Sequence, residues 1–201
     1  MPDEEILTKG ERTRRAVMDA AYRLFMEQGF HATSMRQIAD RAGLALGGIY
    51  NHFRGKDEVF VAVLLDHHPY RQIIPLLRDA PGETVDEFVH SAARAMIAEL
   101  GRQPDFLNLM FIEIVEFKGR HVPMLFETIF PDIQPLMQRF LQASGNLRPI
   151  PLPILLRAFL GMFFSYYITE ILIGRSLPHE MQENALEHFA EIFLHGILSK
   201  S

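Results

Sequence analysis

The sequence predicts an all-α protein in two parts, a helix-turn-helix unit in the first quarter and a longer helical remainder. Apolar residues recur three and four positions apart along most of the chain, which places them on one face of a helix. Glycine and proline separate these stretches from one another. The 201 residues, 48% of them hydrophobic, suffice for one or two globular domains, and we find no internal repeat.

A single apolar stripe predicts the first helix. Its members fall at the spacing of one helix face: Val17, Ala20, Ala21, Leu24 and Phe25. Gly29 can take the positive φ that ends a helix, so we expect the helix to stop there.

Three shorter helices follow within the same quarter. Ser34 can cap the second helix, and Gln37 can return the bond in a capping box. The second helix has the stripe Met35, Ile38, Ala39 and Ala42, the third holds Ile49, Tyr50 and Phe53, and a turn at Arg54 and Gly55 leads to a fourth stripe, Val59, Phe60, Val63 and Leu64.

The spacing of Ala39, Gly43 and Ile49 is typical of a turn that reads DNA. Ala39 lets two helices cross closely, Gly43 permits the positive φ of a sharp turn, and Ile49 fills the angle between the helices. In that geometry the outer face of the third helix enters the major groove. A helical corner that binds nothing is the alternative.

Charge divides the chain at the same place. Between Lys9 and Lys56 there are 9 basic and 4 acidic residues, a net charge of +5, whereas from Asp57 onward there are 11 basic and 18 acidic residues, a net charge of −7. This asymmetry favours a polyanion partner for the first part, and an ordinary solvated helix face is the alternative.

A set of residues with a familiar spacing lies between Arg12 and Phe60: Ala20, Ala21, Leu24, Phe25, Gly29, Thr33, Ile38, Ala39, Ala42, Gly43, Gly47, Tyr50, His52, Phe53, Lys56 and Glu58. With these residues the stretch resembles the DNA-binding domain of the tetracycline-repressor (TetR/AcrR) family of bacterial transcriptional regulators. The run Gly-Ile-Tyr-Asn-His-Phe-Arg-Gly-Lys, from Gly48 to Lys56, is highly specific. The resemblance covers about a quarter of the chain.

The resemblance implies a domain organisation and a set of DNA contacts. We expect a flexible acidic N-terminus at 1–10, a DNA-binding domain at 11–56, and a helical ligand-binding and dimerisation domain at 57–201. Carried over residue by residue, the expected phosphate contacts are Thr33, Ser34, Tyr50, His52 and Lys56. Hydroxyls, helix N-termini and a lysine are suitable phosphate ligands.

The third helix departs from the family's usual pattern. Ala45 stands where a Ser-type cap is common, and Leu46 and Gly48 stand where larger or polar side chains are common. Gly47 and Gly48 together cost up to ~2 kcal/mol of helix propensity relative to alanine, and they let the backbone approach DNA closely.

Few side chains are therefore available to read bases. Only Asn51 and Arg36 can form bidentate hydrogen bonds with bases, while Ala45 and Leu46 can contact a thymine methyl. We expect a large share of the specificity to come from DNA shape.

Helices are expected throughout the remainder. In order, these are an amphipathic helix at Thr84–Arg102, a more apolar one at Asp105–Phe117, a stretch broken by Pro123 and Pro131, a helix at Ile133–Leu141, a loop at Gly145–Pro153, an all-round apolar helix at Leu155–Ile173 and an amphipathic one at Met181–Leu198.

The last two helices suggest a second copy of the chain as a partner. A helix that is apolar on all sides must be covered on several faces. In the family that the chain resembles, the last two long helices form a four-helix dimer interface, and the helices before them enclose a ligand cavity. Leu155–Ile173 and Met181–Leu198 occupy those places, and burial within one monomer is the alternative.

The candidate ligand site is an aromatic and Met-rich set suited to a bulky apolar molecule. Its members are Phe106, Met110, Phe111, Glu113, Phe117, Phe126, Met162, Phe163, Tyr166 and Tyr167. Glu113 and Glu170 interrupt apolar runs and can face a cationic group of a ligand, or else reach solvent or an arginine. For the apolar members, simple core packing is the alternative.

Several classes of protein are excluded or disfavoured. The chain has no Cys, which removes disulfides, thiol nucleophiles and Cys-ligated metals. Only Glu87–His90 has a Glu-x-x-His spacing, and we expect no enzymatic activity, cofactor or metal. The polar start lacks a secretory core, and the uncharged run Ala158–Thr169 is shorter than the ~20 residues of a membrane span, so we expect a protein of the bacterial cytosol and nucleoid.

Together these features predict a ligand-responsive DNA-binding regulator. We expect a repressor that binds a pseudo-palindromic double-stranded operator as a homodimer and is released by a small, largely apolar effector. The connecting helix at Asp57–His67 is the expected lever between ligand and DNA. A helical scaffold or ligand-binding protein with weak or lost sequence-specific DNA binding is the alternative.

Overall fold

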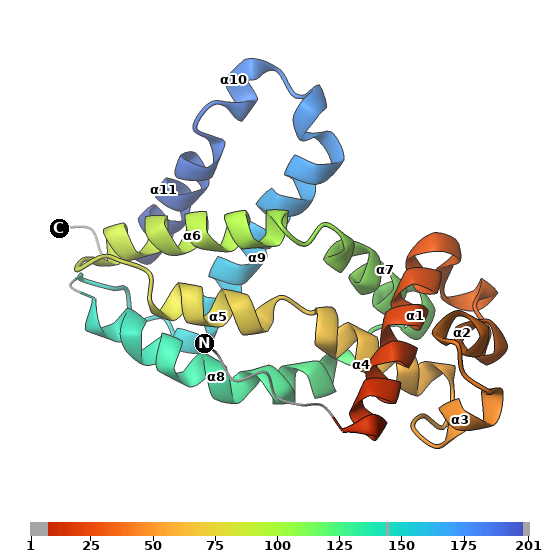
Figure 1. Ribbon diagram of the computed structural model, residues 1–201. Coiled ribbons are helices and arrows are strands. Elements are labelled where there is room, and N and C mark those ends of the chain that lie inside the picture. The colour runs from red at the N-terminus through yellow and green to blue at the C-terminus, as the bar shows by residue number, and fades with distance from the viewer. Residues whose placement is uncertain (1–7, 144, 199–201) are drawn as a thin grey trace, which may run out of the picture. The chain divides into compact units, whose positions relative to one another are not determined.

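The computed structural model describes residues 8–143 and 145–198, and within these stretches the chain forms helices and no named strand (Figure 1). The helices are α1 (Lys9–Ala32), α2 (Met35–Ala42), α3 (Leu46–Tyr50), α4 (Lys56–His67), α5 (Tyr70–Arg78), α6 (Val85–Gly101), α7 (Asp105–Phe117), α8 (Val122–Gln142), α9 (Leu152–Ile173), α10 (His179–Gln182) and α11 (Ala185–Ile197), with a 3₁₀ turn at Gly174–Ser176. The all-α prediction is confirmed.

Packing divides the chain into two compact units. Unit 1 comprises the chain up to His68 together with Asp105–Phe126, and unit 2 comprises Pro69–Pro104 together with the chain from Glu127 onward. The chain therefore passes between the units three times: after α4, before α7 and within α8.

The core of unit 1 joins α7 to the helices of the first quarter. The ring of Phe117 at the end of α7 stacks on Phe60 of α4 at 4.8 Å and meets Phe30 of α1 edge-on at 4.7 Å. Leu109 of α7 is fully buried in the same cluster. The packing units therefore do not follow the expected division at residues 56 and 57, because the apolar face of α7 completes the core beneath the helix-turn-helix.

Helix α1 begins earlier than the sequence suggested. The Thr8 hydroxyl accepts a hydrogen bond from the Glu11 N–H, and the Glu11 carboxylate accepts one from the Thr8 N–H at 2.7 Å. This capping box starts the helix at Lys9, so residues 8–10 are not the flexible segment we expected, while residues 1–7 lie outside the described part of the chain. Gly29, at φ 81°, ends the regular part of α1, and one further turn reaches Ala32.

Unit 2 is built on α5, α6, α8, α9 and α11. The Thr84 hydroxyl and Glu87 form the capping box that starts α6. The Tyr167 hydroxyl of α9 donates to the Leu100 carbonyl of α6 at 2.8 Å, and Phe163 is fully buried. These contacts fix α9 against α6.

Three expectations about the remainder are corrected. Pro131 and Pro135 lie inside a continuous α8, where both are exposed, so water can satisfy the carbonyls that lose a partner. The helix expected at Met181–Leu198 is divided, because Asn184 takes a left-handed conformation at φ 52° between α10 and α11. Helix α5 was not predicted, and α9 begins at Leu152, inside the expected loop.

Helix α9 is apolar on its outer side as well as its inner side. By length and composition alone it could cross a membrane, a test that core helices of other proteins also pass. Its exposed apolar residues include Ile154, Leu160, Ile171 and Leu172, and Ile192 is exposed in the same way on α11. A large apolar area on unit 2 is therefore left without cover by the described chain.

Candidate nucleic-acid interface

Thr33 and Ser34 shape the turn between α1 and α2. The Thr33 side chain is buried, and its hydroxyl donates to the Gly29 carbonyl at 2.8 Å. The predicted phosphate contact through this hydroxyl is therefore corrected, because the group is used inside the turn. Ser34 is exposed and forms the predicted capping box with Gln37, at 3.2 Å from its hydroxyl to the Gln37 N–H. The open N-terminus of α2 remains available for a phosphate.

The turn between α2 and α3 has the expected geometry. Gly43 adopts φ 67°, and the Leu44 N–H reaches back to the Ala39 carbonyl at 3.0 Å. Ala39 and Ile49 are 1% and 0% exposed, so a small residue and an apolar plug meet between the helices, as predicted. This pattern of bonds is the one that ends a helix at a left-handed residue.

Helix α3 presents two large side chains to solvent. Tyr50 is 51% exposed and Asn51, at its C-terminal end, is also exposed. His52 is half-buried, and Leu46 packs partly against the core of unit 1, which reduces what it can offer to a base. Ala45 is exposed and makes no side-chain cap.

Arg36 on α2 is exposed as well. The two groups that the sequence singled out as bidentate base readers, its guanidinium and the Asn51 amide, are therefore both on the surface.

Neither glycine of α3 is required by the fold. Gly47 and Gly48 lie in a right-handed helix, and a Cβ at either position would meet no neighbouring atom within 4 Å. Glycine costs about 1 kcal/mol relative to alanine inside a helix, so these two residues do not stabilise the folded chain. The absence of side chains at these positions would instead allow a binding partner to approach the backbone of α3 closely.

Lys56 has a different role from the one expected. Its ammonium donates to the carbonyls of Phe30 and Thr33, both at 2.6 Å, and lies 4.2 Å from the centroid of the Phe30 ring. These bonds close the C-terminal end of α1 and occupy the ammonium, so the predicted phosphate contact of this side chain is corrected. Burial lowers the pKa of Lys56.

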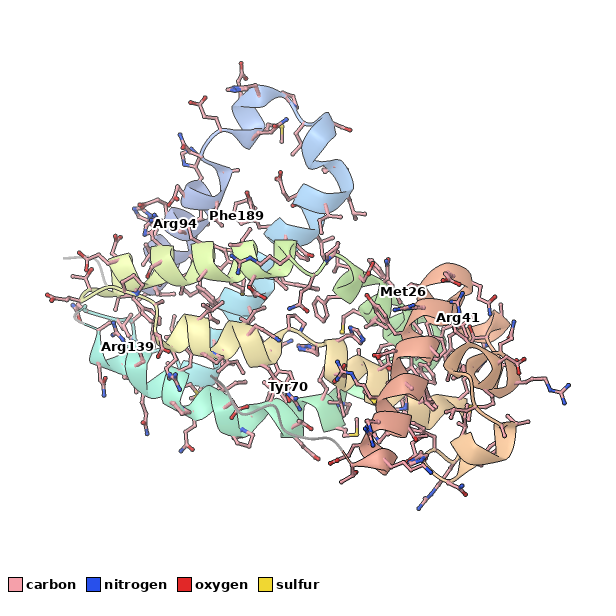
Figure 2. The ribbon with its side chains drawn as sticks, viewed as in Figure 1. Met26, Arg41, Tyr70, Arg94, Arg139 and Phe189 are labelled. Carbon is pink, nitrogen blue, oxygen red and sulfur yellow. The ribbon has the colours of Figure 1, made fainter. Side chains whose placement is uncertain are left out.

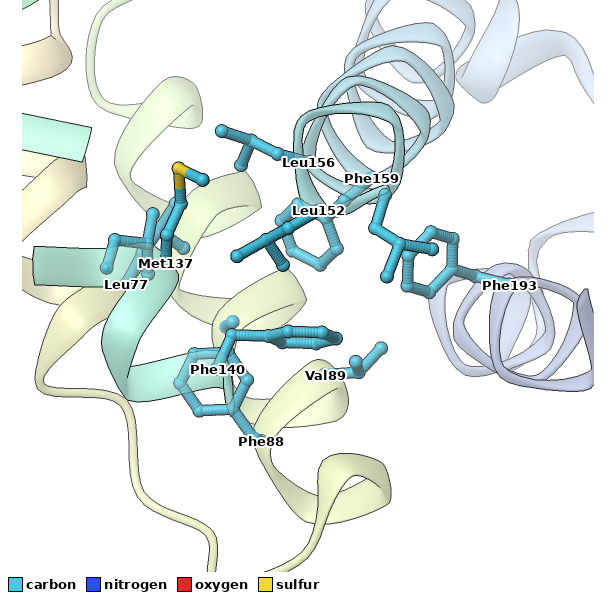
Figure 3. A pocket seen from close by; sticks show the side chains of 12 residues that line it. Leu77, Phe88, Val89, Met137, Phe140, Leu152, Leu156, Phe159 and Phe193 are labelled. Atoms are coloured by element: carbon cyan, nitrogen blue, oxygen red, sulfur yellow. The ribbon is translucent and has the colours of Figure 1, made fainter. Parts of the chain in front are cut away.

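A small apolar cavity lies inside unit 2 (Figure 3). Its lining comes from five helices: Leu77 of α5, Phe88, Val89 and Ala92 of α6, Leu136, Met137 and Phe140 of α8, Leu152, Leu155, Leu156 and Phe159 of α9, and Phe193 of α11. The cavity measures about 40 Å³. Pockets for drug-sized ligands measure about 300 Å³ or more, so this cavity is too small for such a ligand at its present size.

The ten residues predicted to bind a ligand are not among those that line this cavity. Phe106, Met110, Phe111, Glu113 and Phe117 belong to α7 and Phe126 to the start of α8, all in unit 1, whereas Met162, Phe163, Tyr166 and Tyr167 belong to α9 in unit 2. Several of them serve the core: Phe106, Phe163 and Tyr167 are buried, and the Tyr166 ring lies 5.1 Å from that of Phe189, which Figure 2 labels. The structure does not bring the set together around one cavity.

Glu113 is a fully buried carboxylate with partners of its own. It accepts hydrogen bonds from the His121 N–H at 2.7 Å and pairs with the His121 Nδ1 at 2.8 Å. Both oxygens are thus satisfied within unit 1. Glu170, the other acidic residue considered, is exposed.

Residues 17–63 match the family model for bacterial regulatory proteins of the tetR family. Along nearly the whole chain, the sequence is similar to an uncharacterized HTH-type transcriptional regulator, YvkB, of Bacillus subtilis (strain 168). The two are 26% identical over 191 residues, which cover 92% of this chain and 97% of YvkB. The chain carries a TetR-family DNA-binding unit.

Solved structures of the TetR family share the fold of this chain. One is a putative tetR family transcription regulator from Shewanella sp. PV-4, with a TM-score of 0.67 and 18% identity, covering 94% of this chain and 99% of that one. Another is a complex of SmeT with triclosan, with a TM-score of 0.64 and 21% identity, covering 94% and 93%. The TetR-type arrangement of helices therefore extends through both units.

The fold of the TetR-family unit also places one residue near α3 that sequence reasoning did not single out. The Arg14 guanidinium lies 4.8 Å from the centroid of the ring of Phe53, which follows α3 in the turn before α4. Arg14 and Phe53 are far apart along the chain, and no spacing rule links them, so only the folded unit brings them together.

Proposed function

We propose that this TetR-family regulator is a repressor that binds a pseudo-palindromic operator as a homodimer and leaves it when a small apolar molecule binds. The observation that carries the proposal is the exposed surface of α3, formed by Gly47, Tyr50 and Asn51 on a correctly built helix-turn-helix turn. These residues do not contribute to the hydrophobic core, and a helix with an exposed face of this kind can enter the major groove.

Within the proposed complex, positioning and reading fall to different residues. The N-terminus of α2 at Ser34, with Tyr50 and His52, contacts phosphates, which fix the register of the protein on DNA. Arg36 and Asn51 read bases, and Ala45 and the two glycines bring the backbone close to the groove. With so few readers, DNA shape supplies much of the remaining preference.

A homodimer is proposed because a two-fold palindrome requires two reading units about 34 Å apart. The exposed apolar residues of α9 and α11, including Leu160, Leu172 and Ile192, supply a surface for a second copy. Covering them would remove these exposed apolar side chains from water, which favours association.

The effector site is proposed at the cavity of unit 2, opened beyond its present size. Every lining side chain is apolar, which favours an uncharged apolar ligand. SmeT, a structural neighbour, was solved with triclosan, an instance of a small molecule bound by a protein of this fold. Helix α8, which contributes Leu136, Met137 and Phe140 to the wall, also contains Pro131 and Pro135, whose missing backbone bonds weaken the helix.

Ligand and DNA are coupled through the chain connections between the units. Helix α4 ends at one connection and α7 begins at another, so a shift of either helix moves the helix-turn-helix core. By linkage, an effector that lowers DNA affinity is itself bound more weakly by the DNA complex, with a typical coupling of about 1–3 kcal/mol. The proposed place of action is the cytosol.

Genomic footprinting with the purified full-length protein tests this function. We expect a palindromic footprint at physiological salt, and we expect triclosan, used as an apolar probe, to weaken binding to the recovered site. Sequence-blind binding without a footprint would contradict the operator model and would favour the helical scaffold, an outcome that the short, glycine-rich α3 makes worth testing.

A further inference from the structure

The basic side chains of unit 1 fall into two groups. One group is neutralised by carboxylates: Arg15 pairs with Asp66 at 2.9 Å, Arg41 with Glu27 at 2.6 Å and Arg120 with Asp57 at 3.0 Å. Arg41, labelled in Figure 2, lies on α2. These pairs leave little net charge where they lie.

The other group has no ion pair within the described residues of unit 1: Lys9, Arg12, Arg14, Arg23, Arg36, Arg54, Lys118 and Lys56, whose ammonium is bonded to backbone carbonyls instead. Arg36 precedes α3 on α2, and Arg54 follows it. Arg14 belongs to α1, yet the fold brings it to the end of α3.

Arg14 is held in place by an aromatic ring. Its guanidinium lies over Phe53, whose side chain is 1% exposed and therefore fixed in the core. One N–H of Arg14 reaches the sulfur of Met18 at 3.0 Å, a weak acceptor, while the residue as a whole is exposed. A guanidinium has five N–H donors, so several remain for a partner. The ring fixes the orientation of the guanidinium before any partner arrives, which lowers the entropy cost of binding.

The first turn of α1 continues this surface. A Cβ at Gly10 would lie 3.8 Å from Cε1 of His52, so the start of α1 runs beside the residue that follows α3. Lys9, the first residue of α1, adds a second unpaired cation there. The positive surface around α3 therefore extends from Arg36 on α2 to α1.

We propose that Arg14, seated on Phe53, binds a DNA phosphate at the edge of the groove that α3 enters, and that Lys9 adds a weaker phosphate contact. This inference rests on the proposed function. A planar guanidinium binds the oxygens of one phosphate through two parallel hydrogen bonds, and DNA presents a negative charge about every 1.7 Å along its axis. The contact carries no sequence information, so it strengthens binding to every duplex alike.

One acidic residue opposes the proposed contact. Glu11 lies in the first turn of α1 with its carboxylate bonded to the Thr8 N–H. Glutamine can make the same capping bond without the charge, so Glu11→Gln is expected to tighten DNA binding severalfold while keeping the helix start.

The test compares Arg14→Ala with Arg23→Ala in the full-length protein. Arg23 is an exposed, unpaired arginine on the same helix, so both changes remove one charge. The probes are a 30-base-pair duplex of unrelated sequence and the recovered operator, titrated by fluorescence anisotropy between 50 and 200 mM salt. Each lost phosphate contact is expected to reduce the salt slope of log K by about 0.9 and the affinity at 0.1 M salt by about tenfold. Arg14→Ala should show this loss on both duplexes, and Arg23→Ala should keep the wild-type slope.

Three results would overturn the inference. The first is an unchanged slope in Arg14→Ala, or an equal loss in Arg23→Ala, while wild-type protein binds both duplexes; the proposed function then stands without Arg14. The second is a change in preference between operator and unrelated duplex, because a phosphate ligand affects both alike. The third is a wild-type protein that binds neither duplex, which removes the proposed function together with the inference. Thermal denaturation checks the fold, and Arg14→Gln replaces the alanine variant if that one is unfolded.

Discussion

The Tyr22 hydroxyl donates a 2.6 Å hydrogen bond to the carboxylate of Asp105, which ties the middle of α1 to the first residue of α7. The same tyrosine ring stacks on His67, the last residue of α4, with the ring centroids 3.8 Å apart. One side chain thus holds the two points where the chain leaves unit 1 and returns to it. Burial and the bond to Asp105 raise the pKa of Tyr22 to about 12, so the hydroxyl keeps its proton at neutral pH.

Removing this hydroxyl is expected to weaken unit 1. Tyr22→Phe keeps the stack on His67 but loses a hydrogen bond to a charged group, so the free energy of unfolding should fall by about 1–2 kcal/mol. Tyr50→Phe is the matched control, because Tyr50 is half exposed and its loss of a hydroxyl should leave stability unchanged. Urea denaturation of both variants measures the difference, and equal midpoints would contradict the expected role of the bond.

Acid is expected to destabilise the protein through His68. Burial lowers the pKa of His68 to about 4, whereas the unfolded chain has the ordinary value of about 6.5. The unfolded state therefore binds more protons between these values, and stability falls as the pH drops from 6.5 towards 4, by about 2 kcal/mol at pH 5 from this residue. His68→Gln should flatten this dependence. Denaturation at pH 7.5 and pH 5 checks it, and an unchanged slope in the variant would exclude His68 as the cause.

Gly48→Ala should separate stability from DNA binding. The added methyl meets no neighbouring atom and improves helix propensity, so the melting temperature should rise by an amount equivalent to up to about 1 kcal/mol. If DNA approaches the bare backbone of α3, the same change should lower operator affinity. Gly101→Ala, at an equally open helical glycine in α6, should leave DNA binding unaltered. Unchanged operator affinity in Gly48→Ala would mean that nothing approaches this part of α3.

Charge on the outer face of α11 should dissociate the proposed dimer. Ile192 is 63% exposed, and Ile192→Glu places a carboxylate where the second copy would cover it. Leu141→Glu on α8 is the control, because Leu141 is 62% exposed and lies outside the proposed interface. Analytical ultracentrifugation should find monomers for the first variant and dimers for the second. If the two variants associate alike, the interface lies elsewhere.

Glu113→Gln is expected to act on stability and to leave triclosan binding unchanged. The buried carboxylate accepts the backbone N–H of His121 and pairs with its ring, and an amide in its place removes the charge that strengthens both bonds. The free energy of unfolding should fall by about 1–3 kcal/mol. Glu127→Gln, an exposed residue of α8, provides the baseline. Calorimetric titration gives the affinity for triclosan. If this affinity is weaker in Glu113→Gln and unchanged in Glu127→Gln, Glu113 is part of the ligand site.

The helix-turn-helix could be predicted because its determinants are local. The Ser34 cap and the left-handed Gly43 act within a few residues of themselves, and periodicity alone supplied the buried face around Ala39 and Ile49. Lys56 could not be placed in the same way. Its ammonium reaches the carbonyls at the end of α1, and no pattern in the sequence distinguishes that from a free surface lysine.

The part of the chain after α4 was less predictable, because its features depend on tertiary packing. Apolar residues of α7 indicated a helix but not which core would receive it, so Phe117 was expected at a ligand and lies against Phe60 instead. The cavity needs contributions from five helices, one of which was not predicted. The prediction that proline would break the chain's helical structure here was wrong, because α8 contains two internal prolines that are exposed to water.

The three chain passages between the units constrain any exchange of DNA specificity with a relative. A transplanted DNA-binding segment that ends at His68 would lack Leu109 and Phe117. The rings of Phe30 and Phe60 would then lose the side chains that cover them. Such a fragment should be insoluble or partly unfolded, whatever its recognition helix reads. Recombination that exchanges DNA specificity therefore has to include α7 together with α1 to α4. Otherwise specificity can change only through substitutions on α2 and α3.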